Sequence, residues 1–93
     1  MGTVINDTLQ EILKGYVAKN LTPDVSEILR LRRFYHKGKN YYDVFVKDAR
    51  GILHIINQGP MEIEEAAQLL VNTTVDMVTF LKTINWKKDF RGQ

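Results

Sequence analysis

The sequence predicts an α+β domain of order α-β-β-β-α, in which two helices pack on one face of a three-stranded antiparallel meander. Strand-favouring residues flank two glycine-containing turns, at Gly38 and Gly51, within residues 28–57. Apolar residues recur with a helical period on both sides of this stretch. Runs of alternating residues between two amphipathic helices are typical of a small α+β fold.

The composition is that of one globular domain, 1–93, with loose ends expected at 1–5 and 87–93. Hydrophobic residues make up 44% and charged residues 26%, which argues against disorder. The chain has no cysteine, which suits a reducing compartment, so we expect a cytoplasmic protein. No run approaches 18 apolar residues, and residues 1–20 lack a secretory pattern, so we expect no membrane partner.

The net charge of +2 hides an uneven distribution. Residues 28–47 contain six Lys or Arg against one acid, Asp43, which gives a local charge of +5. Residues 58–81 contain four acids and no Lys or Arg, a local charge of −4, and residues 82–93 have a charge of +3. The distribution of charge along the chain is therefore more informative about charged partners than the net charge is.

The first helix is predicted to begin at Asn6 or Asp7, whose side chains can cap it. It should end near Asn20, because Pro23 cannot extend a helix. Its apolar stripe follows i, i+3, i+4, i+7, i+8 spacing and consists of Leu9, Ile12, Leu13, Tyr16 and Val17.

Residues 23–27 are predicted to form a turn or a single helical turn, with the first strand starting near Ile28. Residues 29–32 alternate apolar and basic side chains, as a strand does. The alternative is a helix that continues to Arg33, which Thr22 as cap and Pro23 at the first helical position would favour.

A type II′ turn at Gly38-Lys39 would close the first hairpin and pair Tyr35 with Tyr42. Alternation then separates a core face, which includes Leu29, Leu31, Val44 and Val46, from a basic and aromatic face. The basic and aromatic face consists of Arg30, Arg32, Phe34, His36, Tyr41, Asp43, Phe45 and Lys47. A register shift of one residue would mix the two faces. The third strand, 52–56, is apolar on both sides, so its sequence does not determine which side chains point inward.

The last helix is predicted to start after Pro60, with Glu62, Glu64 and Glu65 complementing the helix dipole. Helical apolar spacing then continues for more than about 20 residues, to Ile84. The weak helix formers at 72–74 could kink this helix or divide it.

The sequence lacks the patterns of catalysis, so we predict no enzyme, no cofactor, no metal and no small-molecule substrate. Ser26 has no histidine near it in the sequence. His36 and His54 lack metal-ligand spacing, although the hairpin register would allow them to share a sheet face.

The first functional hypothesis is a small non-enzymatic binding or regulatory domain that contacts a protein partner or a second copy of itself. The apolar excess of the C-terminal helix predicts that contact, because Trp, Met and Phe are typical of interface cores. The predicted interface residues are Val75, Met77, Val78, Phe80, Leu81, Ile84 and Trp86.

The alternative hypothesis is nucleic-acid binding by the basic and aromatic strands, with cations on phosphates and rings on bases. The predicted residues are Arg30, Arg32, Arg33, Phe34, Lys37, Lys39, Tyr41 and Phe45. The element order resembles that of the double-stranded-RNA-binding domain. That family has lysines at the start of its last helix, where this chain has Glu62, Glu64 and Glu65, so its function is not transferred. Basic residues also protect the edges of sheets from aggregation, which is the competing explanation.

Overall fold

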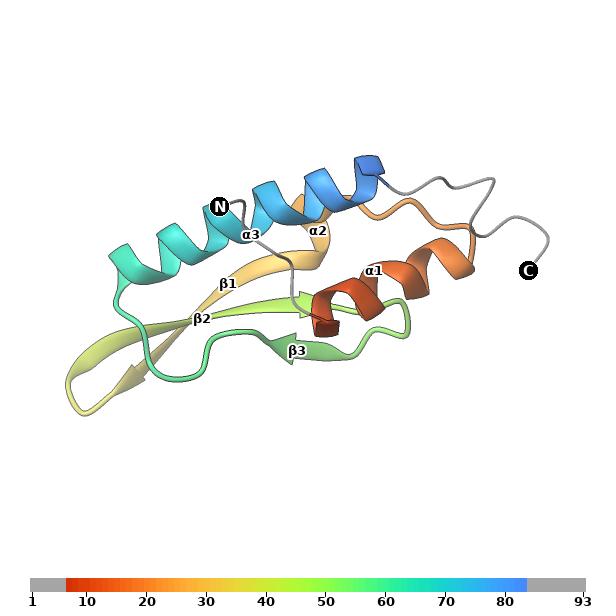
Figure 1. Cartoon of the computed structure of the whole chain (residues 1–93). Helices are drawn as coiled ribbons and strands as arrows, with labels where there is room; N and C mark the ends of the chain where they lie inside the picture. Colours follow the sequence, from red (N-terminus) through yellow and green to blue (C-terminus); the bar gives the residue numbers. More distant parts are fainter. Residues whose placement is uncertain (1–6, 84–93) are drawn as a thin grey trace.

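Two long helices lie on one side of a three-stranded antiparallel sheet in the computed structural model, which describes residues 7–83 (Figure 1). The elements in chain order are α1 (Asp7–Ala18), α2 (Val25–Ile28), β1 (Leu29–His36), β2 (Lys39–Lys47), β3 (Leu53–Ile55) and α3 (Ile63–Thr83). The strands follow the order β1-β2-β3, a meander. This confirms the predicted α-β-β-β-α fold, and α2 is the single helical turn that was one of the two possibilities for residues 23–27. The predicted loose ends, 1–5 and 87–93, lie outside the described residues, as does Asn6.

α1 buries the whole predicted stripe, from Leu9 to Val17. It ends in a Schellman motif, in which Asn20 adopts a φ of 59°. The Asn20 N–H donates to the Val17 carbonyl at 2.8 Å, and the Leu21 N–H donates to the Tyr16 carbonyl at 2.9 Å. Asparagine tolerates this left-handed backbone better than most residues, which explains why the helix stops here.

The segment before the first strand forms the predicted single helical turn. Asp24 caps α2, because its Oδ1 accepts from the Ser26 N–H at 3.0 Å and from Ser26 Oγ at 2.7 Å. β1 then starts at Leu29, so the alternative of a helix continuing to Arg33 is wrong. A strand places Leu29 and Leu31 on the same face, whereas a helix would turn them to different sides.

The β1–β2 hairpin closes through a two-residue loop, Lys37-Gly38. Both residues have positive φ, 50° and 81°, which defines a type I′ turn. The predicted type II′ turn at Gly38-Lys39 is therefore wrong, and the pairing is shifted by two residues. The observed pairs include Leu29↔Val46, Leu31↔Val44, Arg33↔Tyr42 and Phe34↔Tyr41.

The observed register has a clear physical reason. It places Leu31 opposite Val44, so that apolar side chains pack against each other across the strands. The predicted register would have placed Arg33 opposite Val44 and Leu29 opposite Asp48. Because a shift of two residues preserves the alternation, the predicted division into two faces is retained.

The core lies between the inner face of the sheet and the helices. Val44 and Val46 of β2, Leu13 of α1 and Met77 of α3 have no exposed surface. α3 is one continuous helix, without the break considered at residues 72–74. Thr73 is buried there, and the neighbouring Thr74 Oγ1 donates to a carbonyl one turn earlier in the helix, at 2.7 Å. Tertiary packing and this local bond compensate for the weak helix propensity.

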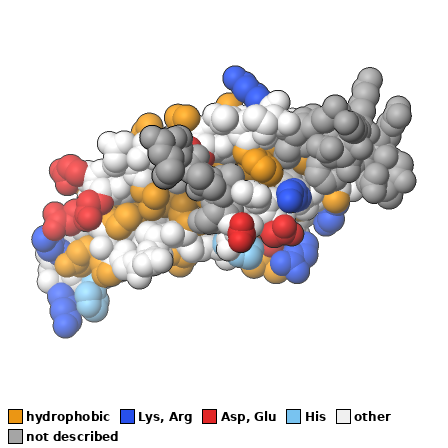
Figure 2. Space-filling model, in the orientation of Figure 1, with side chains coloured by type: hydrophobic (Ala, Val, Ile, Leu, Met, Phe, Trp, Pro, Cys, Tyr) orange, Lys and Arg blue, Asp and Glu red, His pale blue; other side chains and the backbone are white. Residues whose placement is uncertain are grey.

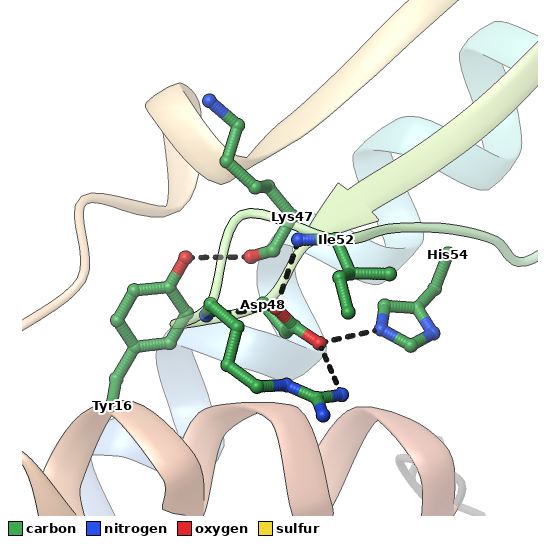
Figure 3. Close-up of polar contacts among 6 residues, drawn as sticks. Tyr16, Lys47, Asp48, Ile52 and His54 are labelled. Carbon is green, nitrogen blue, oxygen red and sulfur yellow. Dashed lines mark hydrogen bonds and ion pairs between the residues drawn. The ribbon is translucent and has the colours of Figure 1, made fainter.

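Asp48 organises the turn between β2 and β3, and Tyr16 of α1 bonds to the backbone beside it (Figure 3). Its Oδ1 accepts from the Arg50 and Ile52 N–H groups at 2.9 and 3.0 Å. Its Oδ2 lies 2.9 Å from His54 Nε2. The bond to His54, together with those from the turn, lowers the pKa of Asp48 well below its usual range. Close by, Tyr16 Oη donates to the carbonyl of the residue before Asp48, at 2.6 Å.

The two histidines lie on opposite faces of the sheet. His54 is paired with the buried Val46 and faces the helices, whereas His36 alternates onto the other side of β1. The suggestion that they share a face is therefore wrong. The Asp48 turn determines which side chains of β3 face the helices, and the sequence of this strand does not reveal it because both of its sides are apolar.

Candidate nucleic-acid interface

The side of the sheet turned away from α1 and α3 is not covered by any helix of the described chain (Figure 1). We call it the outer sheet face. Strand pairing assigns to it Arg30, Arg32, Phe34 and His36 of β1, Lys39, Tyr41, Asp43, Phe45 and Lys47 of β2, and Leu53 and Ile55 of β3. It thus unites basic, aromatic and aliphatic side chains from all three strands.

Aromatic rings form the centre of the outer sheet face. Phe34 and Tyr41 are direct cross-strand partners, with ring centroids 5.9 Å apart and an interplanar angle of 32°. His36 extends this group, 6.5 Å from the Tyr41 ring. Phe34, Tyr41 and Phe45 are all half-buried, so each is held by its neighbours and still presents surface to solvent.

Arg32 joins the aromatic and charged parts of this face. Its guanidinium carbon lies 5.5 Å from the centroid of the Phe45 ring, within the range of a cation–π contact. Its Nη2 is also 3.5 Å from Asp43 Oδ2. The Arg32 side chain is 50% exposed and that of Asp43 only 16%, so an approaching ligand meets the cation more than the acid.

The four other predicted cations, Arg30, Arg33, Lys37 and Lys39, occupy four different environments. Arg30 is exposed on the outer sheet face and has no ion pair among residues 7–83. Arg33 is exposed on the opposite side of β1, and Lys37 lies in the hairpin loop. Lys39 Nζ donates to Glu62 Oε2 at 3.0 Å. This hydrogen bond, followed by the Glu62 charge, raises the pKa of Lys39 above its usual value.

The structure therefore brings together Arg30, Arg32, Phe34, Tyr41 and Phe45, and places Arg33 and Lys37 elsewhere. Lys39 lies at the hairpin end of the outer sheet face, opposite His36, and is paired there with Glu62. Figure 2 shows acidic side chains over the start of α3, beside the basic side chains of the hairpin tip. The tip is thus a mixed-charge region, whereas the outer sheet face has an excess of cations.

The residues predicted for nucleic-acid contact did not include Lys47, Leu53 and Ile55, which also belong to this face. Leu53 is 46% exposed and Ile55 51%. Alternation along β2 had already placed Lys47 on the basic and aromatic face. Leu53 and Ile55 could not be assigned in this way, because the side chains on both faces of β3 are apolar.

Of the residues predicted for a protein interface on the C-terminal helix, the five that the structure describes do not form one surface. Met77 is fully buried in the core, and Val78, Phe80 and Leu81 are half-buried against it. Val75 is 58% exposed, and Val71, one turn earlier, is 57% exposed. Ile84 and Trp86 lie outside the described residues. Most of the apolar excess noted in the sequence is used to cover the sheet.

Two open grooves lie on the helix side. The first, of about 550 Å³, runs between α1 and the Asp48 turn and has acids and bases intermixed along it. The second, of about 590 Å³, separates α2 from the second half of α3 and includes Pro23, Val78 and Leu81. Within residues 7–83, no three His, Cys, Asp or Glu side chains gather as metal ligands would. No helix in this range is both long and apolar enough to cross a membrane.

Comparisons of the chain with models of protein families, with curated proteins and with solved structures found no match. The arrangement of side chains on the outer sheet face is therefore the observation from which a function can be inferred.

Proposed function

We propose that this domain binds nucleic acid through the outer sheet face. The observation that supports the proposal is the convergence of three cations, Arg30, Arg32 and Lys47, with three aromatic rings on a face that no described helix covers. Basic side chains attract phosphates, and aromatic rings provide surfaces on which bases stack. A non-enzymatic role belongs to the same proposal because the sequence shows no catalytic pattern, and a cytoplasmic location because the absence of cysteine suits a reducing compartment.

The charge distribution favours one orientation of the ligand. Glu62, Glu64 and Glu65 stand at the start of α3 and would repel phosphates from that end of the helix layer. On the outer sheet face the single acid, Asp43, is mostly covered and is paired with Arg32. Because the ring of Phe45 and the Asp43 carboxylate already hold Arg32, this guanidinium loses less freedom when it meets a phosphate.

Fluorescence anisotropy with mixed oligonucleotides across a salt series tests the proposal. Three phosphate contacts on a single strand give a slope of about −2 in log K against log salt concentration. Arg30→Glu should weaken binding and make the slope shallower by about 0.7. Lys14→Glu makes the same change in net charge on an exposed residue of α1 and should leave binding nearly unchanged. Absence of binding at low salt would contradict the proposal.

A second candidate function is contact with a second copy of the chain through α3, as part of a binding or regulatory role. The observation that favours it is the pair of exposed valines, Val71 and Val75, on successive turns of the helix. Sedimentation velocity at several concentrations tests it, with Val75→Glu expected to shift the protein to monomer. A wild-type protein that stays monomeric to high micromolar concentration would refute this candidate.

A further inference from the structure

We infer that the nucleic acid bound by the outer sheet face is single-stranded, with unpaired bases stacked at two separate positions. The first position is the Phe34–Tyr41 pair, and the second is Phe45 together with the Arg32 guanidinium. This inference rests on the proposed function and names the class of nucleic acid that the geometry fits.

The first stacking position is a continuous ring surface across two strands. Phe34 and Tyr41 are direct partners in the ladder, with ring centroids 5.9 Å apart, and no helix within residues 7–83 covers either ring. Both rings are half-buried, so their orientation is fixed by packing before a ligand arrives. Prior ordering of this kind lowers the entropy cost of binding.

The second stacking position combines a ring and a planar cation. The Arg32 guanidinium lies 5.5 Å from the Phe45 centroid and is 50% exposed, so it can meet a base or a phosphate. Bases in single strands stack on aromatic side chains and on guanidinium planes alike. Leu53 and Ile55, about half exposed beside Phe45, extend this position with apolar surface.

The two stacking positions need bases that have left their own stack. Phe45 lies four residues beyond Tyr41 on β2, which is about 13 Å along a strand, so the two positions receive different bases. In a duplex strand the faces of each base are covered by neighbouring bases about 3.4 Å away along the axis. A base that lies on a ring must therefore leave that stack, and a single strand allows this at both positions at far lower cost than a duplex.

Among residues 7–83, no helix is placed to enter a duplex groove from this side. α1 and α3 lie on the opposite side of the sheet, so neither can enter a major groove while this face is in contact (Figure 1). A two-stranded ribbon can enter such a groove. At the β1–β2 tip, however, Lys39 is paired with Glu62, and the acids at the start of α3 lie beside it (Figure 2). Those acids would meet the phosphates on the groove walls.

The test compares labelled RNA probes of about 12 nucleotides, one unpaired and one as a blunt duplex of the same sequence, from about 50 mM to about 200 mM salt. We expect the full chain to bind the single strand about tenfold more tightly. Phe34→Ala and Phe45→Ala should each lower affinity for the single strand about 5- to 150-fold, the loss typical of one stacked base. Their affinity for the duplex should stay nearly the same.

Two further variants keep the comparison interpretable. Tyr35→Ala removes a ring of the same strand that is 72% exposed and faces the helix side, so its affinity should match wild type. Arg32→Lys keeps the charge and loses the planar guanidinium, so affinity for the single strand should fall several-fold with an unchanged salt slope. Arg32→Lys alters a half-exposed side chain, so it also serves if Phe45→Ala unfolds the domain.

The outcomes separate the inference from the function on which it rests. Equal or tighter binding of the duplex, with no effect of Phe34→Ala or Arg32→Lys, would overturn the single-strand inference and leave nucleic-acid binding intact. Absence of binding to both probes at the lowest salt would overturn both. Poly-glutamate is included as a third probe. If it binds as tightly as RNA and responds only to charge changes, the outer sheet face takes an acidic protein and the inference is wrong.

Discussion

On the inner side of the sheet, Val44 and Val46 have no exposed surface, whereas Phe45 between them lies on the outer sheet face and is half-buried. The two faces are made by alternate residues of the same strands, and only one of them is covered by helices. Burial makes the inner residues responsible for stability. The outer residues contribute less to stability because they are less buried. This explains how basic and aromatic side chains are tolerated in the middle of a sheet.

The comparison also explains why the hairpin tip is a poorer site than the centre of the outer sheet face. Lys39 is neutralised by direct contact with Glu62, whereas Arg32 is oriented by Phe45 and a mostly covered Asp43. A compensated surface cation adds little to binding a polyanion. A cation that is held in place and exposed adds more, because its rotamer is already selected.

The largest expected effect on stability comes from truncating a buried side chain on the inner side of the sheet. Leu29→Ala on β1 removes a side chain that is 4% exposed and should cost about 2–5 kcal/mol of the free energy of unfolding. Leu53→Ala makes the same chemical change on the outer sheet face, where Leu53 is 46% exposed, and should cost less than about 1 kcal/mol. Urea unfolding measures both. Similar losses would show that the outer sheet face is part of the core.

An intermediate effect concerns the Asp48 turn, which sets the parity of β3. The folded pKa of Asp48 is lowered, so its stabilising contribution is present above the unfolded pKa of about 3.8. That contribution is lost as pH falls below this value toward the lower folded pKa. Thermal midpoints from pH 6 to about pH 2 should therefore fall more steeply for wild type than for Asp48→Asn, which starts lower at pH 6.

The control for this pH series is Glu11→Gln, which changes an exposed carboxyl in the middle of α1, away from both ends of the helix. Its profile should run parallel to that of wild type. If Asp48→Asn also ran parallel, the bonds of Asp48 to His54 and to the turn would not govern the acid sensitivity of the fold.

The smallest effect tests the hairpin loop that keeps the two faces in register. Lys37→Asn places Asn-Gly in a type I′ turn and should raise the free energy of unfolding by a few tenths to about 1 kcal/mol. If the turn were type II′ at Gly38-Lys39, Lys37 would be a strand residue and the same change would destabilise the hairpin. Thermal unfolding distinguishes these two signs, with Asn40→Gln as a neutral strand control.

Local patterns in the sequence were sufficient for the elements and for the two faces of the hairpin. The stripe from Leu9 to Val17 predicted α1, because apolar periodicity is a local property. The alternation in β1 and β2 predicted which residues share a face, and this survived an error of two residues in register. Which side chains of a strand share a face depends only on the strand itself. The central residues of the candidate site could therefore be predicted from the sequence.

Only the tertiary structure decided the turn type, the parity of β3 and the use of the apolar residues of α3. Lys37-Gly38 is preferred because it pairs Leu31 with Val44 across the strands, a contact that no local pattern encodes. Leu53 and Ile55 face outward because the Asp48 turn orients a strand that is apolar on both sides. Met77 and Val75 are both apolar and lie in one helix, but only Met77 meets the sheet. Burial is a property of neighbouring elements, so it was not determined until those elements were packed.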